Sequence, residues 1–146
     1  MHALLVLLFF QVTNIFNCVS HFSVNSSLKI RIENLESNKG HVLVSLFHSK
    51  EGFPDKPQKA VRKASITIKD NKAWVVFTGL QTGSYAAAIL HDENDDLKMN
   101  TNFFGIPTEG YGFSNNVMGM FGPPSFSKAS FVLSAAANEI TIRAKN

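Results

Sequence analysis

Apolar and polar residues alternate along much of this chain, as they do in β-strands with one buried face. In the segment SLKIRIENL (27–35), Leu28, Ile30 and Ile32 share one face, and charged side chains occupy the other. The segment HVLVSLF (41–47) is apolar on both faces, which is typical of a strand at the centre of a sheet. Five further segments have the length and composition of strands: 65–69, 73–80, 83–92, 128–134 and 138–144.

Short polar turns separate most of these segments and predict how the strands connect. The sequence DNK (70–72) predicts a hairpin between the third and fourth strands, and a short turn also joins the last two. Almost no segment has helical periodicity. Seven short strands with tight turns predict an all-β, antiparallel β-sandwich of the immunoglobulin-like or prealbumin-like (transthyretin-like) type. Trp74 is the only tryptophan, and the Cys…Trp…Cys signature of immunoglobulin domains is missing.

A long segment, 92–127, lies between the fifth and sixth predicted strands. Loops of this length are uncommon in compact domains and are usually functional or disordered. Its many aromatic rings argue against disorder and predict an ordered Ω-like excursion that buries its own side chains. Rings that face a ligand are the alternative. The rings in question are Phe103, Phe104, Tyr111, Phe113, Phe121 and Phe126.

The amino-terminal residues read as a targeting segment. Residues 1–16 are apolar and uncharged, and the first lysine in the chain is Lys29. This pattern predicts a signal peptide over 1–20, cut after Ser20, with a lipid anchor at Cys18 as the competing reading. Residues 21–146 would then form a single β-sandwich domain without cysteine or a transmembrane segment. We expect an exported monomer in the periplasm, outside the cell or at its surface.

The net charge of +3 comes from lysines and arginines that are scattered along the chain. No basic stripe with interleaved aromatic residues is present, so nucleic-acid binding is not expected.

The stretch HDENDDLKMN (91–100) holds four acidic side chains and two asparagines in ten residues. Its D-x-N-x-D spacing matches the first half of a calcium loop, in which alternate side chains supply oxygen ligands. Leu97 and Phe103 depart from the full EF-hand pattern, which has glycine and glutamate there, and Glu109 is a candidate remote ligand. A solvated turn that bonds its own backbone is the alternative. The candidate Ca²⁺ ligands are Asp92, Asn94, Asp96 and Asn100.

Enzymatic readings find less support. A hydrolase acting on a cell-envelope carbohydrate would need two carboxylates in contrasting environments, drawn from Asp92, Glu93 and Glu109. No nucleophile motif is present. His41 and His48 lie at opposite ends of one predicted strand. At about 3.3 Å per residue they are about 23 Å apart, so they cannot share a metal.

Four segments carry a resemblance to a known family: GHVLVSLFHSKEGFP (40–54), GLQTGSYAAAILHDEN (79–94), GIPTEGYGFSNN (105–116) and FGPPSF (121–126). Over about 28–143 the chain resembles the bacterial family called domain of unknown function 2141. The resemblance implies an exported bacterial β-sandwich protein of the periplasm or cell surface, and it implies no established activity.

The family pattern in the acidic stretch resembles H-D-x-N-x-N-G-x-x-D. In this chain Asp96 replaces the second Asn, Leu97 replaces the glycine and Asn100 replaces the final Asp. The loss of a glycine and of a carboxylate implies weaker cation binding than in relatives.

The working hypothesis is therefore a non-enzymatic binding or structural module of the cell envelope, with Ca²⁺ as the one candidate cofactor. Its partner would be an envelope component or a small ligand. The candidate binding residues are His91, Glu109, Tyr111, Phe113, Asn115 and Asn116.

Overall fold

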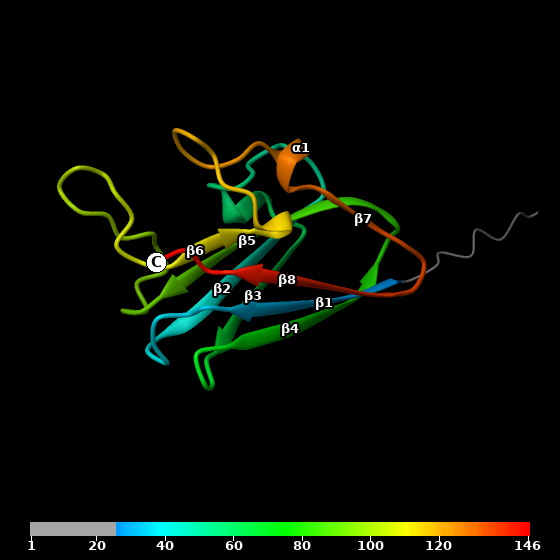
Figure 1. Cartoon of the computed structure of the whole chain (residues 1–146). Coiled ribbons are helices and arrows are strands. Elements are labelled where there is room, and N and C mark those ends of the chain that lie inside the picture. Colours follow the sequence, from blue (N-terminus) through cyan, green and yellow to red (C-terminus); the bar gives the residue numbers. More distant parts are fainter. Residues whose placement is uncertain (1–25) are drawn as a thin grey trace, which may run out of the picture.

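The computed structural model describes residues 26–146, so the predicted signal peptide, its cut after Ser20 and Cys18 lie outside the described residues. Two β-sheets pack face to face, with short helical turns beside one of them (Figure 1). The strands are β1 (Ser26–Glu33), β2 (His41–Phe47), β3 (Arg62–Thr67), β4 (Ala73–Leu80), β5 (Gly83–Asp92), β6 (Tyr111–Phe113), β7 (Phe131–Leu133) and β8 (Ala137–Arg143). The helical turns are η1 (Pro57–Lys59), η2 (Ser114–Asn116) and α1 (Phe126–Ala129).

The first sheet has three strands in the order β4-β1-β8, and the second has the order β3-β2-β5-β6, with β7 paired to β5. Their facing surfaces form the main core. The predicted inward face of the first strand is confirmed, because Leu28, Ile30 and Ile32 are fully buried. The prediction that 41–47 is a central strand is confirmed as well, since β2 lies between β3 and β5.

The all-β class and the two-sheet arrangement agree with the prediction, but the strand directions differ in one place. β1 and β8 are parallel, so the three-stranded sheet is mixed. An alternating pattern reports which face of a strand is buried and carries no information about its direction. The prediction of a purely antiparallel sandwich is therefore wrong at this pair.

Two predicted strand pairs also separate into different sheets. Asp70 and Asn71 form a tight turn with φ of 54° and 58°, and Lys69 and Lys72 bridge across it. Beyond this turn β3 pairs with β2 whereas β4 pairs with β1. The short segment between β7 and β8 likewise crosses from one sheet to the other. The residues of each turn predict that the chain reverses direction there. They do not predict which strand each neighbour pairs with.

The long segment 92–127 contains an eighth strand that the sequence pattern did not reveal. β6 has only three residues and adds to the edge of β5, where Phe113 lies opposite Ala88 and Tyr111 opposite Leu90. Three residues are too few to show alternation. After β6 the chain forms η2, which lies against β8, and α1, which lies against β5 and η2.

A second, smaller core covers part of that outer face. The rings of Phe47, Phe113 and Phe126 surround Phe53 in edge-to-face contacts, with centroids 5.4, 6.1 and 5.9 Å from it. Such arrangements match the positive edge of one ring to the negative face of another. We call this set the outer aromatic cluster. It fixes α1 and the loop around Phe53 above the sheet.

The expectation that segment 92–127 buries its own rings holds for only some of them. Phe113 is buried and Phe126 packs in the outer aromatic cluster. In contrast, Phe103 and Phe121 are each 97% exposed, and Phe104 is 82% exposed. For these three rings the packing prediction is wrong.

Candidate functional site

The acidic stretch forms a loop at the end of β5, built around the side chain of Asp92. This carboxylate is fully buried and accepts hydrogen bonds from the backbone N–H of Asp96 (3.1 Å) and of Leu97 (2.9 Å). Gly40 allows the adjoining turn to approach closely. It has φ of 61°, and a Cβ there would lie 1.9 Å from the carbonyl oxygen of Asp92. Only glycine fits this contact.

Two further side chains of the loop accept the same kind of bond from the backbone. Asn94 Oδ1 accepts from the N–H of Asp96 (3.2 Å), and Asp96 Oδ1 accepts from the N–H of Lys98 (2.9 Å). Leu97 has φ of 63°, the left-handed region that favours glycine. The loop therefore has the backbone shape that the family glycine would allow, with leucine in its place.

Glu109 joins the two ends of this loop. Its Oε1 accepts the N–H of Glu93 and its Oε2 accepts the N–H of Asn100, both at 3.0 Å. Asn100 Oδ1 is buried and has no hydrogen-bond partner. The structure thus brings Asp92, Asn94 and Asp96 together, while Asn100 and Glu109 meet through a backbone bond.

His91 lies fully buried beneath the loop. Its Nε2 is 3.0 Å from the carbonyl oxygen of Lys39, and because a carbonyl only accepts, Nε2 carries the proton. Its Nδ1 has no hydrogen-bond partner and lies 3.7 Å from Oε1 of Glu93, which also accepts a bond from the Ser37 hydroxyl. Asp95 turns outward and contacts His41 at 2.6 Å.

The chemistry of these carboxylates is that of hydrogen-bond acceptors. Asp92 and Glu109 use all four oxygens to bind backbone N–H groups, which gives no support to an acid–base pair. Glu93 and Asp95 point to different partners, Ser37 and His41. Within residues 26–146, no three His, Cys, Asp or Glu side chains gather closely enough to hold a metal ion.

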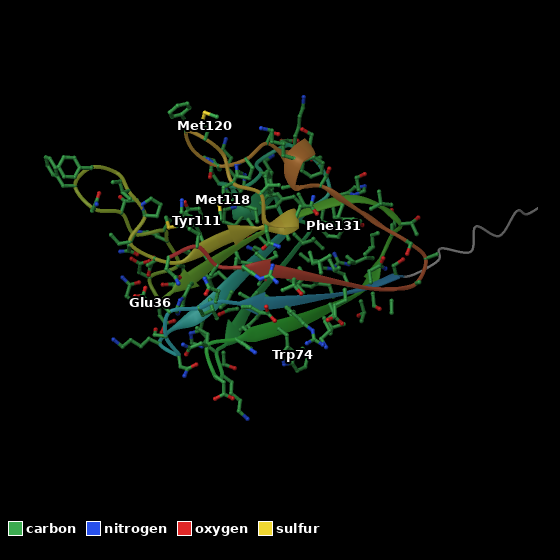
Figure 2. The ribbon with its side chains drawn as sticks, in the orientation of Figure 1. Glu36, Trp74, Tyr111, Met118, Met120 and Phe131 are labelled. Carbon is green, nitrogen blue, oxygen red and sulfur yellow. The ribbon has the colours of Figure 1, made fainter. Side chains whose placement is uncertain are left out.

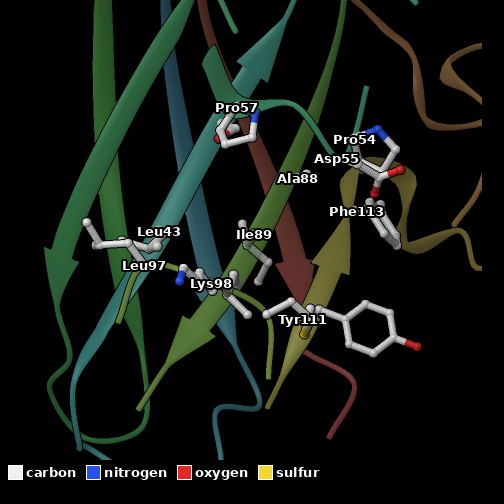
Figure 3. Close-up of a pocket in the computed structure, with 13 residues that line it drawn as sticks. Leu43, Pro54, Asp55, Pro57, Ala88, Ile89, Leu97, Lys98, Tyr111 and Phe113 are labelled. Carbon is white, nitrogen blue, oxygen red and sulfur yellow. The ribbon is translucent and has the colours of Figure 1, made fainter. Parts of the chain in front are cut away.

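A groove lies on the outer face of the five-stranded sheet, beside the outer aromatic cluster (Figure 3). The strand register explains its shape. Ser45, Ala88 and Phe113 form one cross-strand row, and Leu43, Leu90 and Tyr111 form the next. Ser45 and Ala88 are small, so the floor is low between larger neighbours. We call this site, with a volume of ≈420 Å³, the sheet groove.

Two loops form the rims of the sheet groove. Pro54, Asp55 and Pro57 stand on one side, and Leu97, Lys98 and Met99 of the acidic loop stand on another (Figure 3). Most of the lining is apolar, with a carboxylate and an ammonium group at separate points. The acidic loop therefore contributes to the groove through its apolar end.

The sequence-derived binding residues divide between the sheet groove and structural roles. Tyr111 and Phe113 line the groove. Asn115 Nδ2 donates to the carbonyl oxygens of Lys128 (3.2 Å) and Ser130 (2.8 Å). Asn116 Oδ1 accepts from the N–H of Arg143 at 2.7 Å. The two asparagines fasten η2 to its neighbours, and neither lines the groove.

The sequence did not reveal the groove floor. Leu43 and Ser45 belong to a strand that is apolar on both faces, and Ala88 belongs to a run of alanines. The useful signal was a small residue beside large ones on an outward face, but strand register is needed to place Ser45 next to Ala88.

No helix in the described residues is long and apolar enough to cross a membrane.

Comparisons with solved structures return distant matches. A crystal structure of the pilus-presented adhesin Spy0125 (Cpa) has 12% sequence identity and a TM-score of 0.26 over 83% of this chain. A cysteine-to-alanine mutant of the same adhesin has 12% identity and a TM-score of 0.24 over 86% of this chain. The matches span 27% and 28% of the adhesin chains. TM-scores this low carry no argument about function.

No curated protein matches the chain at a significant level. A family model does match, over residues 30–141, which is most of both sheets and the whole of the acidic loop and sheet groove. This chain therefore belongs to the family described as "Uncharacterized protein conserved in bacteria (DUF2141)".

Proposed function

We propose that this protein is an exported, non-enzymatic binding module of the bacterial cell envelope, and that its sheet groove takes a small amphipathic ligand. One observation carries the proposal. The outer face of a sheet in a sandwich normally meets water and is polar, yet here it holds an open apolar groove of ≈420 Å³. That volume falls within the range of sites for small molecules, about 300–1,000 Å³.

The lining indicates the chemistry of the ligand. The floor and walls offer aliphatic and aromatic contacts, so the body of the ligand would be apolar. Lys98 on the rim suits an anionic group, because an ammonium ion attracts a negative charge most strongly when both are partly shielded from water. Asp55 stands at another rim and disfavours a second negative charge there.

The test fills the groove and leaves the rest of the fold unchanged. The probe is 8-anilinonaphthalene-1-sulfonate, which joins an apolar ring system to an anionic group and fluoresces when it leaves water. Ser45→Leu and Ala88→Leu should each weaken its binding by about tenfold or more, since the leucine occupies the volume that the probe needs. Thr78→Leu is the control, because Thr78 is exposed on β4 (Ala73–Leu80) of the other sheet and does not line the groove. If all three variants bind the probe as tightly as the parent, the groove is not the site.

We also propose that Ca²⁺ stabilises the acidic loop. The side chains of Asp92, Asn94 and Asp96 lie close together in one loop, and Leu97 adopts the left-handed backbone that favours glycine. Thermal unfolding is followed with EDTA and in a calcium series to millimolar concentration, where weak extracellular sites bind. Calcium should raise the melting temperature of the parent and of the control Glu36→Ala, but not of Asp96→Ala. Asp92 is unsuitable for substitution, because its side chain holds the loop backbone. No shift in the parent would identify the stretch as a self-bonded turn.

Export is a separate part of the proposal, supported by the apolar segment 1–16. Expression of the full chain in a bacterium, followed by amino-terminal sequencing of the purified protein, should return a chain that begins at His21. A chain that still begins at Met1 and remains in the cytoplasm would contradict export.

A further inference from the structure

Two loops on the side of the five-stranded sheet present large apolar side chains to water. The first, 101–107, carries Phe103 and Phe104, which are 97% and 82% exposed. The second, 117–122, carries Met120 and Phe121, which are 88% and 97% exposed. Residues so apolar are seldom left this accessible on a protein that has no partner for them. We call these two segments the loop tips.

The first tip is held in a fixed shape by its backbone. Thr101 and Pro107 form a bridge, and the N–H of Thr108 donates to the carbonyl oxygen of Asn100 at 2.9 Å. Asn102 Oδ1 accepts from the N–H of Phe104 (2.9 Å) and of Ile106 (3.1 Å). The two phenylalanine rings contact each other edge to face, with centroids 5.5 Å apart. The exposed rings are therefore presented by an ordered turn.

The second tip is tight at its centre and anchored at its ends. A Cβ on Gly119 would lie 2.0 Å from the carbonyl oxygen of Gly122, so the chain folds sharply between these residues. Val117 before the tip and Phe126 after it pack against the outer aromatic cluster. The sheet thus supports a loop whose apolar end stands clear of it.

The loop tips project toward a common side of the molecule. In Figure 1 the yellow-green loop that follows β5 and the yellow-orange loop that precedes α1 both extend beyond the sandwich, to the left and the top. Figure 2 places Met120 at the end of the second loop. A flat surface laid against the upper left of this view would meet both tips before any other part of the protein. The pair is convex, so it is shaped to enter a soft apolar layer.

The charges around the tips indicate which apolar layer fits. From 97 to 127 the only charged residues are Lys98 and Glu109, and the Glu109 carboxylate is buried and hydrogen-bonded. Lys128 follows directly after this stretch. Asp95 and Asp96 are the exposed carboxylates that adjoin this stretch in sequence, near the end of β5, and Asp55 is exposed on the rim of the sheet groove. An uncharged apolar end with lysines behind it matches a bilayer, whose hydrocarbon lies beneath a charged headgroup layer.

We propose that the loop tips are a membrane-docking site that inserts Phe103, Phe104 and Phe121 into the interface of a bilayer containing anionic lipids. The rings supply apolar contact at the depth where aromatic side chains gather in membranes. Lys98 and Lys128 attract the anionic headgroups. The site shares Lys98 with the rim of the sheet groove, and it does not depend on a ligand there.

Vesicle binding tests this site with the segment His21–Asn146, which contains every strand of both sheets. Co-sedimentation is measured with phosphatidylcholine vesicles, with and without phosphatidylglycerol. The parent should bind the mixed vesicles, and Phe103→Ser and Phe121→Ser should each weaken binding by about tenfold. Lys128→Gln should weaken binding by about fivefold, and only when the anionic lipid is present. Val132→Ser is the control, since Val132 is an exposed apolar residue on β7, and it should bind like the parent.

Tryptophan fluorescence gives a second readout that reports insertion directly. Trp74 is the only tryptophan, so Phe103→Trp in a Trp74→Phe background places a single fluorophore at the tip. Its emission should move to shorter wavelength on vesicles and be quenched by brominated lipid. Three results would each overturn the proposal: no binding to either vesicle, unchanged binding of both phenylalanine variants, or tip-dependent self-association of the protein with no vesicle binding. The last would identify a second copy of the chain as the partner.

Discussion

Glu109→Gln tests whether one buried carboxylate determines the shape of the acidic loop. Glu109 is 8% exposed, and its two oxygens accept the N–H groups of Glu93 and Asn100, each at 3.0 Å. These residues stand near the start and at the end of the loop. Glutamine keeps the size of the side chain, but it removes the charge and turns an NH₂ group toward one of the two N–H donors.

The expected cost follows from these two bonds. A hydrogen bond to a charged group contributes about 1.5–3 kcal/mol, and a neutral acceptor retains roughly half of that. One bond is lost and the other weakened, so the free energy of unfolding should fall by about 2–4.5 kcal/mol. For a domain of this size the melting temperature should drop by about 6–18 °C.

Urea denaturation measures the change in stability, and amide hydrogen exchange locates it. The N–H groups of Glu93 and Asn100 should lose protection first, because they lose or weaken their acceptor. Glu36→Gln removes an exposed carboxylate that makes no side-chain bond in the structure, and it should leave both measurements unchanged. A loss below about 0.5 kcal/mol with normal protection at both amides would refute this role for Glu109.

Three further outcomes follow from particular contacts. Ser114→Ala should lower stability by about 2 kcal/mol in urea denaturation, because the buried hydroxyl accepts a β5 N–H and donates to an α1 carbonyl; the exposed Ser127→Ala should not. Leu97→Gly should cost nothing or stabilise by up to about 1 kcal/mol, since it relieves a left-handed leucine, and a loss above 1 kcal/mol would contradict the strain. The Lys59 ammonium, hydrogen-bonded to Glu51 at 2.8 Å, lowers the pKa of Glu51 below its ordinary 4.5. Its small stabilising effect is therefore present above pH 4.5 and is lost as pH falls through the lowered pKa. An NMR titration should show this pKa rising in Lys59→Gln, and an unchanged value would rule out the pairing.

The sequence predicted the inner faces of the sandwich well because burial leaves a local signal. Leu28, Ile30 and Ile32 alternate with charged residues, and one face of a half-buried strand must do so. Pairing leaves no such signal. The parallel contact of β1 with β8 joins residues more than a hundred positions apart, and nothing near either strand records it.

The acidic loop shows how one composition can fit two different partners for a side chain. The spacing of Asp92, Asn94 and Asp96 predicts oxygens that converge. In the structure Oδ1 of Asp92 and Oδ1 of Asn94 both meet the N–H of Asp96, whereas Oδ2 of Asp96 faces Nδ2 of Asn94. Sequence alone cannot tell whether the oxygens meet a cation or the backbone of their own loop, because both arrangements need acceptors at alternate positions. The bonds to the N–H groups of Asp96 and Leu97 satisfy the backbone partner.

The two outer faces of the sandwich show on which side binding should occur. A sandwich needs apolar residues only on its inner faces. The outer face of the three-stranded sheet is largely polar, with Trp74 and Val76 as its exposed apolar residues. Its outer face carries Lys29 and Arg31, which pair with Glu139, and Lys29 lies 5.7 Å from the centre of the Trp74 ring. Its charged side chains remain in water and satisfy one another.

The five-stranded sheet departs from the rule in three ways, since its outer side holds the outer aromatic cluster, the sheet groove and the loop tips. The outer aromatic cluster stabilises the fold, because its rings bury one another. The groove and the tips contribute nothing comparable to the fold, because their apolar surface still faces water, where it gains no hydrophobic stabilisation. Stability therefore explains the cluster alone, and the other two features are the ones for which we propose contact with something outside this chain. The tips belong to segments that connect strands, and the groove lies on an outward face of the same sheet, so a partner on that side meets them without disturbing the core.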